Sequence, residues 1–250
     1  MPLSLDKIDL HIHTTFSDGL CSVEEAVKLA RAKKLEMFAI TDHYSEFCDR
    51  PKRMPKGQLK VYLETLASHD VIRGVEADIL PDGVSISKKT TGLFDLVLGG
   101  LHNLRDRVFW GDDRPIWNPR VFVEDVRVTL IKAIESDLLD VLVHPTWLPE
   151  DIRPQTKHLI SKDWIESIVD ASSDHQVAIE ISGAWKVPDE LFVAQCLRHG
   201  VKLSIGSDAH TPSGIGDVGY AVDLLRRVGA PSESVFLPDQ TWQERSCAKK

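Results

Sequence analysis

Residues 7–13 read KIDLHIH, an apolar, β-rich run that ends in two histidines one residue apart. Similar runs recur along the chain, and each is short and rich in Val, Ile, Leu or Phe. Strands that are buried on both faces have this composition. The sequence therefore predicts seven buried strands, at KIDLH (7–11), MFAIT (37–41), VIRGVEA (71–77), FDLVLGGL (94–101), LDVLVH (139–144), VAIEIS (177–182) and VKLSIGS (201–207).

Segments with helical periodicity separate most of these runs. In SVEEAVKLARAKK (22–34) the apolar residues recur at helical spacing, and Ser22 with Glu25 has the spacing of a capping box. Further helices are predicted at 58–68, 120–137, 161–174, 188–199 and 217–229. Alternating strands and helices predict an α/β fold with a parallel sheet. We expect one domain over residues 1–230, followed by a closing segment and a polar C-terminal tail at 231–250 that ends in a disordered CAKK.

Polar residues at the strand ends distinguish between a doubly wound sandwich and a closed barrel. Every predicted strand ends in, or is followed at once by, His, Asp or Glu: His11, Asp42 with His43, Glu76, His102, His144, Glu180 and Asp208. In a parallel barrel the carboxyl ends of all strands face one rim, so these residues would converge. In an open sheet they would be strung along an edge. The pattern favours the barrel.

The bulk composition excludes several classes of protein. Hydrophobic residues make up 42% and charged residues 27%, and no apolar run approaches the ~18 residues that a membrane span requires. The net charge of -8 argues against a protein that holds duplex nucleic acid on a basic face. The four cysteines form no CxxC pair, and the N-terminus has no signal segment. We therefore expect a cytoplasmic protein with reduced thiols and no membrane partner.

The ten histidines fall into two sets. Four lie away from the strand ends and are interpreted as surface or structural residues: His69, His158, His175 and His199. The other six stand at strand ends beside Asp or Glu: His11, His13, His43, His102, His144 and His210. Imidazole and carboxylate are ligands that zinc, manganese and iron accept together. Burying so many polar groups without an ion would cost several kcal/mol, so the second set predicts a metal site.

The individual motifs differ in how clearly they indicate metal ligands. Strand alternation points His11 and His13 to the same side, where both can reach one ion. The role of Asp18 stays open on the residues alone, because it can be a ligand or the N-terminal cap of the helix that begins near Ser22. AITDH (39–43) and SIGSDAH (204–210) each end a strand in an Asp/His combination. Together these motifs extend the predicted site from the first strand to the last.

Six motifs resemble those of the polymerase and histidinol phosphatase (PHP) family of metal-dependent phosphoesterases. They occur in the family's order across nearly the whole chain: DLHIHTTFSDG (9–19), ITDH (40–43), GVEADIL (74–80), GGLHN (99–103), VLVHP (141–145) and GSDAH (206–210). The resemblance implies a distorted seven-stranded (β/α)7 TIM-like barrel in a single domain, in agreement with the strand count. It also implies a site that holds up to three divalent metal ions, with zinc, manganese and iron as candidates.

The resemblance further implies nine metal ligands. One ion is held by His11, His13, Glu76 and Asp208. A second ion shares Glu76 and is also held by His102 and His144, and the third is held by Asp18, His43 and His210. Asp18 stands where some relatives have His. We expect Glu180, in IEISG, to support the site or the fold rather than to bind metal.

The mechanism that the resemblance implies is hydrolysis by a metal-bound hydroxide that attacks phosphorus. Asp208 or His210 is a candidate general acid or base, and Arg105 or Arg107 in the long loop 103–119 is a candidate phosphate clamp. A small phosphorylated substrate suits a single domain with arginine-bearing loops. Our first prediction is therefore a phosphomonoesterase, with histidinol phosphate as one candidate substrate.

Three alternatives stay open at this point. GVEADILPDG (74–83) is similar to PHP domains attached to family X polymerases, so nuclease or nucleotide phosphodiesterase activity on short nucleic acid is the second interpretation. Another alternative is a non-catalytic, metal-binding PHP domain, although the complete ligand set argues against it. Amidohydrolase-like and TatD-like barrels also begin with HxH, but they do not usually combine it with TDH and a terminal DAH. The sequence does not determine the oligomeric state.

Overall fold

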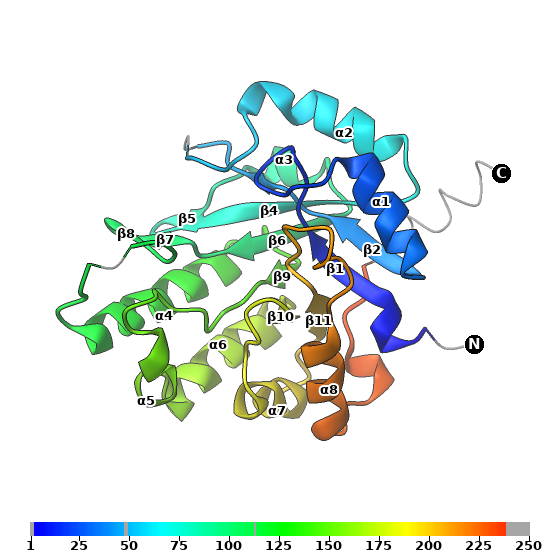
Figure 1. Cartoon of the computed structure of the whole chain (residues 1–250). Coiled ribbons are helices and arrows are strands. Elements are labelled where there is room, and N and C mark those ends of the chain that lie inside the picture. Colours follow the sequence, from blue (N-terminus) through cyan, green and yellow to red (C-terminus); the bar gives the residue numbers. More distant parts are fainter. Residues whose placement is uncertain (1–2, 48–49, 113, 239–250) are drawn as a thin grey trace.

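Seven parallel strands form the centre of the fold in the computed structural model, which describes residues 3–47, 50–112 and 114–238 (Figure 1). Their order in the sheet follows the sequence: β1 (Ile8–Ile12), β2 (Met37–Ile40), β4 (Ile72–Leu80), β6 (Leu96–Gly100), β9 (Val141–Leu142), β10 (Ala178–Ser182) and β11 (Leu203–Gly206). Ile12 pairs in parallel with Ala209, and the amide of His13 donates to the Ala209 carbonyl at 2.9 Å. The last strand thus returns to the first, and the predicted seven-stranded barrel is confirmed.

The barrel is irregular at two places. The register between β1 and β2 shifts between Asp9 and Ile12. Strand β9 keeps only Val141 and Leu142, although the sequence predicts a strand over 139–144. It ends early because His144 has a φ of 35°, a backbone conformation that a strand does not permit. This turn is what aims the His144 side chain into the barrel mouth.

Short strands extend the loops beyond the carboxyl ends of the barrel. Strand β3 (His43–Tyr44) continues the pairing with β4 after β2 has ended, and β5 (Gly83–Val84) turns back antiparallel on β4. A hairpin of β7 (Asn103–Leu104) and β8 (Arg107–Val108) opens the loop that follows β6. The hairpin gives a fixed shape to a loop for which the sequence predicted no element.

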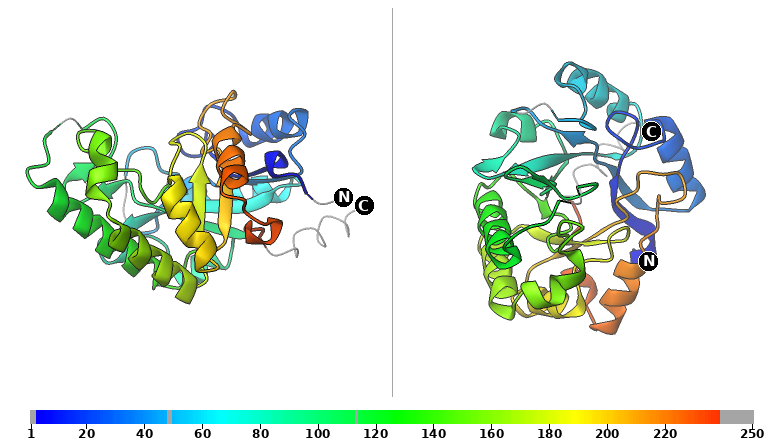
Figure 2. Two further views of the ribbon diagram at one scale, coloured as in Figure 1. Left: turned by 90° about the horizontal axis from the view of Figure 1, so that it is seen from below. Right: turned by 60° about the vertical axis from the view of Figure 1, so that its left-hand side comes forward.

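Helices surround the strands on the outside of the barrel (Figure 2). They are α1 (Val23–Ala32), α2 (Leu59–Ala67), α3 (Lys88–Thr91), α4 (Pro119–Ile134), α5 (Thr156–Leu159), α6 (Lys162–Asp174), α7 (Glu190–Arg198) and α8 (Gly219–Arg227). Single 3-10 turns lie at η1 (Leu5–Lys7), η2 (Lys56–Gln58), η3 (Arg153–Gln155) and η4 (Ser232–Ser234). Each of the six predicted helices is present within a few residues of its expected bounds.

Helix α1 begins at the predicted capping box. The Ser22 hydroxyl accepts from the Glu25 amide at 3.2 Å, and the Glu25 carboxylate accepts from the Ser22 amide at 2.8 Å. The buried side of α1 consists of the apolar residues at helical spacing: Val23, Ala26, Val27 and Ala30. Since Ser22 is the N-cap, Asp18 does not cap this helix, and one of the two roles left open for Asp18 is removed.

Tyr62 connects α2 to β2 and β4 through its hydroxyl group. Its side chain is fully buried, and its hydroxyl lies 3.2 Å from the Ile40 carbonyl and 3.0 Å from the Gly74 carbonyl. The same oxygen accepts from the Asp42 amide at 3.1 Å. The hydroxyl therefore satisfies buried backbone groups at the end of β2 and in the first half of β4.

Replacing Tyr62 by Phe is expected to lower the free energy of unfolding by about 1–3 kcal/mol, because it leaves the buried Asp42 amide without its acceptor. Urea unfolding followed by circular dichroism measures this loss. Tyr220→Phe is the matched control, since the Tyr220 hydroxyl donates to the Pro188 carbonyl at a partly buried position where water can replace it. Equal stability of the Tyr62 variant and the parent would contradict the assignment.

The chain after α8 returns to the barrel. Val235 bridges to Leu203 in parallel, and the amide of Phe236 donates to the Leu203 carbonyl at 2.8 Å. Residues 239–250, which include the predicted CAKK tail, lie outside the described residues. Of the cysteines, Cys21 and Cys196 are free and buried. Within the described part of the chain, the helices are too short or too polar to span a bilayer.

Candidate metal centre

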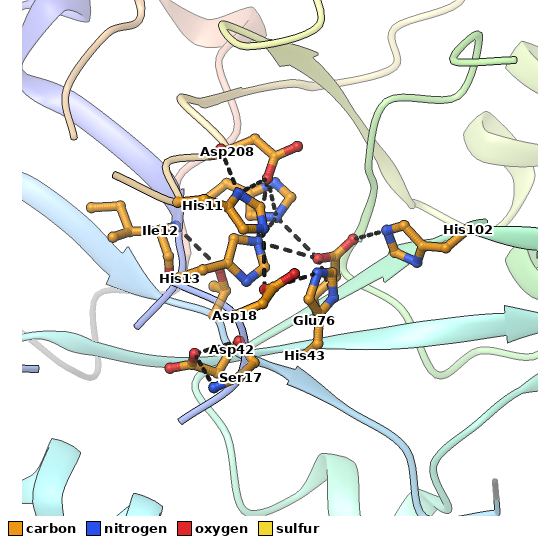
Figure 3. Close-up of polar contacts among 12 residues, drawn as sticks. His11, Ile12, His13, Ser17, Asp18, Asp42, His43, Glu76, His102 and Asp208 are labelled. Atoms are coloured by element: carbon orange, nitrogen blue, oxygen red, sulfur yellow. Dashed lines mark hydrogen bonds and ion pairs between the residues drawn. The ribbon is translucent and has the colours of Figure 1, made fainter. Parts of the chain in front are cut away.

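The nine candidate ligands come together at the carboxyl ends of the barrel strands (Figure 3). They are placed as follows: His11 on β1, His13 and Asp18 after β1, His43 on β3, Glu76 in β4, His102 after β6, His144 after β9, and Asp208 and His210 after β11. Among the described residues, three sets have ligand atoms within 4.8 Å of one another: His11, His13 and Asp208; His13, Asp18, His43 and His210; and His43, Glu76 and His102. The strand-end residues therefore share one rim, as the sequence predicts.

Glu76 lies at the centre of the cluster, where its two oxygens face five imidazole rings. Its Oε2 is 2.8 Å from His43 Nδ1, 3.2 Å from His11 Nε2 and 3.4 Å from His13 Nε2. Its Oε1 is 3.2 Å from His102 Nε2 and 3.4 Å from His144 Nε2. Burial favours the neutral acid, but the imidazoles outweigh it and hold the pKa of Glu76 well below its usual range. Glu76 thus faces one group of histidines with Oε2 and another with Oε1, which is the arrangement that a ligand shared by two ions requires.

Asp208 faces the two histidines of the first strand. Its Oδ1 lies 3.3 Å from His13 Nε2 and 3.6 Å from His11 Nε2, and the two Nε2 atoms are 3.0 Å apart. Asp208 has a φ of 55°, a left-handed conformation that a non-glycine residue rarely adopts. This backbone turn directs the carboxylate toward β1. Three ligand atoms of the kinds that zinc accepts therefore surround one point.

Asp18 lies in the mouth of the barrel beside two histidines. Its Oδ1 is 3.2 Å from His210 Nε2 and 3.7 Å from His43 Nε2. His43 faces Asp18 with Nε2 and Glu76 with Nδ1, so it belongs to two of the three sets. His144 belongs to none of them, although the resemblance assigns it to the second ion. The observed grouping thus differs in detail from the implied division of the ligands among three ions.

The loop that carries Asp18 is fixed by Asp42. Asp42 Oδ1 accepts from the Thr14 amide at 2.8 Å and from the Ser17 amide at 3.1 Å, and Oδ2 accepts from the Thr14 hydroxyl at 2.6 Å. Asp42 is fully buried. In the DH pair after β2, the histidine thus faces the cluster and the aspartate holds the neighbouring loop in place. The sequence pattern alone did not separate these two roles.

Glu180 positions two of the candidate ligands. Its Oε1 lies 2.6 Å from His11 Nδ1, and its Oε2 accepts from the His144 amide at 3.0 Å. A carboxylate on the far ring nitrogen fixes the tautomer, so His11 presents Nε2 to the cluster. The supporting role expected of Glu180 agrees with these contacts.

Asp78 and Arg53 support the cluster in the same way, although no sequence motif assigned either residue to the site. Asp78 Oδ1 lies 3.2 Å from His102 Nδ1, and the Arg53 guanidinium donates to both Asp78 oxygens at 2.9 and 2.7 Å. Burial disfavours a charged imidazole, but Glu76 and Asp78 outweigh it and raise the pKa of His102 to about 9. The available signal was strand alternation, which puts Asp78 on the same face of β4 as Glu76.

Trp185 holds the second oxygen of Asp208. Its indole Nε1 donates to Asp208 Oδ2 at 2.5 Å, while Oδ1 faces His11 and His13. A hydrogen bond to a charged group is worth about 1.5–3 kcal/mol. Trp185 therefore fixes the carboxylate in the orientation that turns one oxygen toward the two histidines.

Replacing Trp185 by Phe is expected to weaken zinc binding about tenfold, because the ring is kept while the hydrogen bond to Asp208 is lost. Competition with a chromophoric chelator measures the affinity. Trp164→Phe is the control, since it removes an indole hydrogen bond of 3.0 Å to the Val123 carbonyl far from the strand ends. An unchanged affinity in the Trp185 variant would show that Asp208 needs no such support.

Several buried atoms of the candidate ligands make no hydrogen bond. Glu76 Oε1, Asp18 Oδ1 and His43 Nδ1 are buried and lie close to charged partners of the cluster without hydrogen-bond geometry, and His13 Nδ1 is buried with no hydrogen-bond partner among the described residues. Buried carboxylate oxygens that accept no hydrogen bond are costly, and a bound divalent cation would remove that cost. Imidazole nitrogen and carboxylate oxygen together suit zinc, manganese and iron. The residues present therefore fit a divalent metal cluster.

The two arginines proposed from the loop 103–119 have acidic partners of their own. Arg105 is exposed and forms an ion pair with Asp125 of α4. Arg107 is buried and donates to Asp112 at 2.7 Å and to the Pro115 carbonyl at 3.2 Å. Their contacts thus lie within the loop and α4. Either arginine would have to exchange its partner in order to bind a phosphate.

Two of the histidines predicted to lie outside the site have surface carboxylate partners. His175 Nδ1 lies 2.9 Å from Asp137, and His199 Nδ1 lies 2.9 Å from Asp170. Both side chains are partly exposed. Their contacts are typical of surface ion pairs, which contribute little to stability.

The fold and the site together define a barrel with a candidate His/carboxylate metal centre at the carboxyl ends of its strands. The model of the PHP domain family matches residues 9–184, and the chain belongs to this family. Most of the candidate ligands fall within the matched range; Asp208 and His210 follow it, directly after the last strand of the same barrel.

The relatives span nearly the whole chain. A probable phosphatase, TTE1963, from Caldanaerobacter subterraneus subsp. tengcongensis is 27% identical over 92% of this chain and 86% of its own length. The probable phosphatase YcdX from Escherichia fergusonii is 24% identical over 92% of this chain and 89% of its own. A crystal structure of histidinol phosphate phosphatase from Lactococcus lactis, complexed with zinc, L-histidinol and phosphate, is similar with a TM-score of 0.66 and 18% identity, over 90% of this chain and 95% of the other. That structural likeness supports the same fold.

Proposed function

We propose that this protein is a metal-dependent phosphoesterase that hydrolyses a small phosphomonoester, with histidinol phosphate as one candidate. The observation that carries the proposal is the position of Glu76, whose two oxygens face five imidazole rings at the rim of a PHP barrel. The names of the relatives, probable phosphatases and a histidinol phosphate phosphatase, point to the same reaction class.

We assign metal binding to the nine candidate ligands, with up to three ions of zinc, manganese or iron. Bound divalent ions supply Lewis acidity, which polarises a phosphate oxygen and makes water a nucleophile at neutral pH. Glu76 would be shared between two of the ions, since its two oxygens face different histidines. Glu180 and Asp78 would orient the imidazoles, and Trp185 would orient Asp208. The free thiols Cys21 and Cys196 are in keeping with a cytoplasmic location, which we also propose.

The remaining chemical roles belong to the mouth of the site. His210 is partly exposed and lies between Asp18 and Asp208, and these carboxylates outweigh burial and raise its pKa. We therefore propose that His210 holds the proton that the leaving oxygen takes up. Asp208 is the weaker candidate for this role, because His11 and His13 outweigh burial and hold its pKa well below its usual range. Arg105 and Arg107 remain the proposed phosphate clamps, on the condition that they exchange their present acidic partners.

Activity toward a panel of esters tests the proposal. Chelated protein is reloaded with zinc, manganese or iron and assayed against histidinol phosphate, glycerol phosphate, bis(p-nitrophenyl) phosphate and a short single-stranded oligonucleotide. We expect phosphate release from the monoesters, and its loss on chelation. Cleavage of the diester or the oligonucleotide alone would identify a phosphodiesterase or nuclease. Metal-loaded protein that turns over none of the panel would identify a non-catalytic domain.

A further inference from the structure

Three tryptophans form a row that leads from the metal centre to the surface. Trp147 is buried, and its ring centroid lies 5.4 Å from that of His144 and 6.3 Å from that of His102. The ring of Trp185 lies 4.4 Å from that of Trp147, and the ring of Trp110 lies 6.5 Å from that of Trp185. Trp110 is 56% exposed. The row thus begins against two candidate ligands and ends in solvent.

Trp185, the middle ring of the row, also contacts the candidate ligand Asp208. The Trp185 indole donates to Asp208, so the row borders a ligand of the first set as well as His102 and His144. Trp110 comes from the loop after β6, Trp147 from the loop after β9 and Trp185 from the segment after β10. The three rings therefore occupy one sector of the rim, where consecutive strands deliver their loops.

Two cations lie on this row, Arg153 from the same segment as Trp147 and Lys52 from the segment after β3. The Arg153 guanidinium is 5.0 Å from the Trp147 ring and 5.7 Å from the Trp185 ring, and it donates to the Leu148 and Phe109 carbonyls at 2.9 and 3.1 Å. Lys52 Nζ lies 4.3 Å from the Trp110 ring. Positive charge along the rings favours an anionic ligand.

Core packing does not account for the whole row. It explains Trp147, which is buried, but not Trp110, which exposes more than half of its side chain to water. The buried Nε1 of Trp147 also has no hydrogen-bond partner among the described residues. Buried indole N–H groups normally have one, so this donor remains available at the inner end of the row.

We propose that the tryptophan row, Trp147, Trp185 and Trp110, binds the leaving group of the substrate, and that this group carries a flat aromatic or heteroaromatic ring joined to the phosphate by a short linker. The inference rests on the proposed phosphomonoesterase activity. With phosphorus at the metal cluster, the leaving group must extend away from it, and the row begins within one ring contact of the cluster. Flat rings stack on indole more favourably than puckered rings of equal size.

A matched pair of substrates tests this. Benzyl phosphate and cyclohexylmethyl phosphate both release a primary alcohol, and they differ in whether the ring is flat. With zinc-loaded or manganese-loaded protein we expect kcat/KM to be about tenfold higher for benzyl phosphate, mainly through KM. Trp110→Leu should remove most of this preference, and Trp110→Phe, which keeps a flat ring, should retain it.

Trp117→Leu is the control variant, because Trp117 lies in the same loop and is 95% exposed. It should keep the full preference for benzyl phosphate. Equal kcat/KM values for the two esters in the parent protein, or an equal loss of preference in the Trp110 and Trp117 variants, would overturn the inference and leave the phosphomonoesterase activity standing. If metal-loaded protein hydrolysed neither these esters nor any other monoester, the proposed function would fail, and the inference with it.

Discussion

Replacing Glu76 by Gln is expected to reduce phosphoesterase activity by about a thousandfold or more and to lower the number of metal ions bound. A carboxamide keeps the size of the side chain but removes the negative charge that two facing halves of the cluster share. A thousandfold loss corresponds to about 4 kcal/mol of transition-state stabilisation, which is within the range of a metal's contribution. Elemental analysis of the purified variant and phosphate release measure the two effects.

The control for this substitution is Glu166→Gln in α6. Glu166 forms a surface ion pair with Lys162 at 3.0 Å, and the substitution removes the same charge on the outside of the barrel. It should leave both metal content and activity unchanged. If the Glu76 variant retained parental activity and metal content, Glu76 would not be a bridging ligand.

Replacing Gly100 by Ala is expected to disrupt the centre through shape alone. A Cβ atom at Gly100 would lie 2.1 Å from Glu76 Oε1 and 2.5 Å from His102 Cε1, far inside van der Waals contact. Both side chains are held by other contacts, so the clash displaces candidate ligands of the second ion. We expect a stability loss of about 1–3 kcal/mol, a lower metal content and nearly complete loss of turnover.

The neighbouring Gly99→Ala variant separates crowding of the core from disruption of the site. A Cβ atom there would lie 2.5 Å from Leu139 Cδ1, the far end of a flexible apolar side chain. It should cost comparable stability and leave the metal content near that of the parent. Thermal unfolding and elemental analysis on both variants make the comparison. Equal metal content in the two variants would mean that Gly100 has no special relation to Glu76.

The barrel was predictable because its signals are local. Each strand is an apolar run that ends in a polar residue, and the Ser22–Glu25 capping box lies within four consecutive residues. The convergence of the strand-end residues follows from parallel topology alone. Strand β9 was overestimated, because the turn at His144 depends on a backbone conformation that residue types do not specify.

The supporting contacts were harder to predict because they join distant segments. Asp78 follows Glu76 by two residues, but its role depends on Arg53 and His102, which arrive from other loops. The same holds for Trp185, whose partner Asp208 follows the next strand of the barrel. Ligand residues could be read from motifs, whereas the groups that orient them become visible only in the folded chain.

The composition of the loop 103–119 did not predict which partners its side chains have in the folded protein. Its arginines suggested a phosphate clamp, but Arg105 is paired with Asp125 on a helix further along the chain and Arg107 with Asp112 in its own loop. Trp110 lies in the same loop and contacts Trp185, but its position in the sequence predicted no function. Counting charges in a loop does not reveal which of them the fold has already neutralised.

A metal titration of the chelated protein tests the central claim most directly. Zinc or manganese is added stepwise to metal-free protein while bound metal and phosphate release from a phosphomonoester are followed together. We expect no hydrolysis without metal, recovery of activity as ions bind, and more than one ion per chain at full activity. Hydrolysis that persists in the metal-free protein, or full activity in Glu76→Gln, would contradict it.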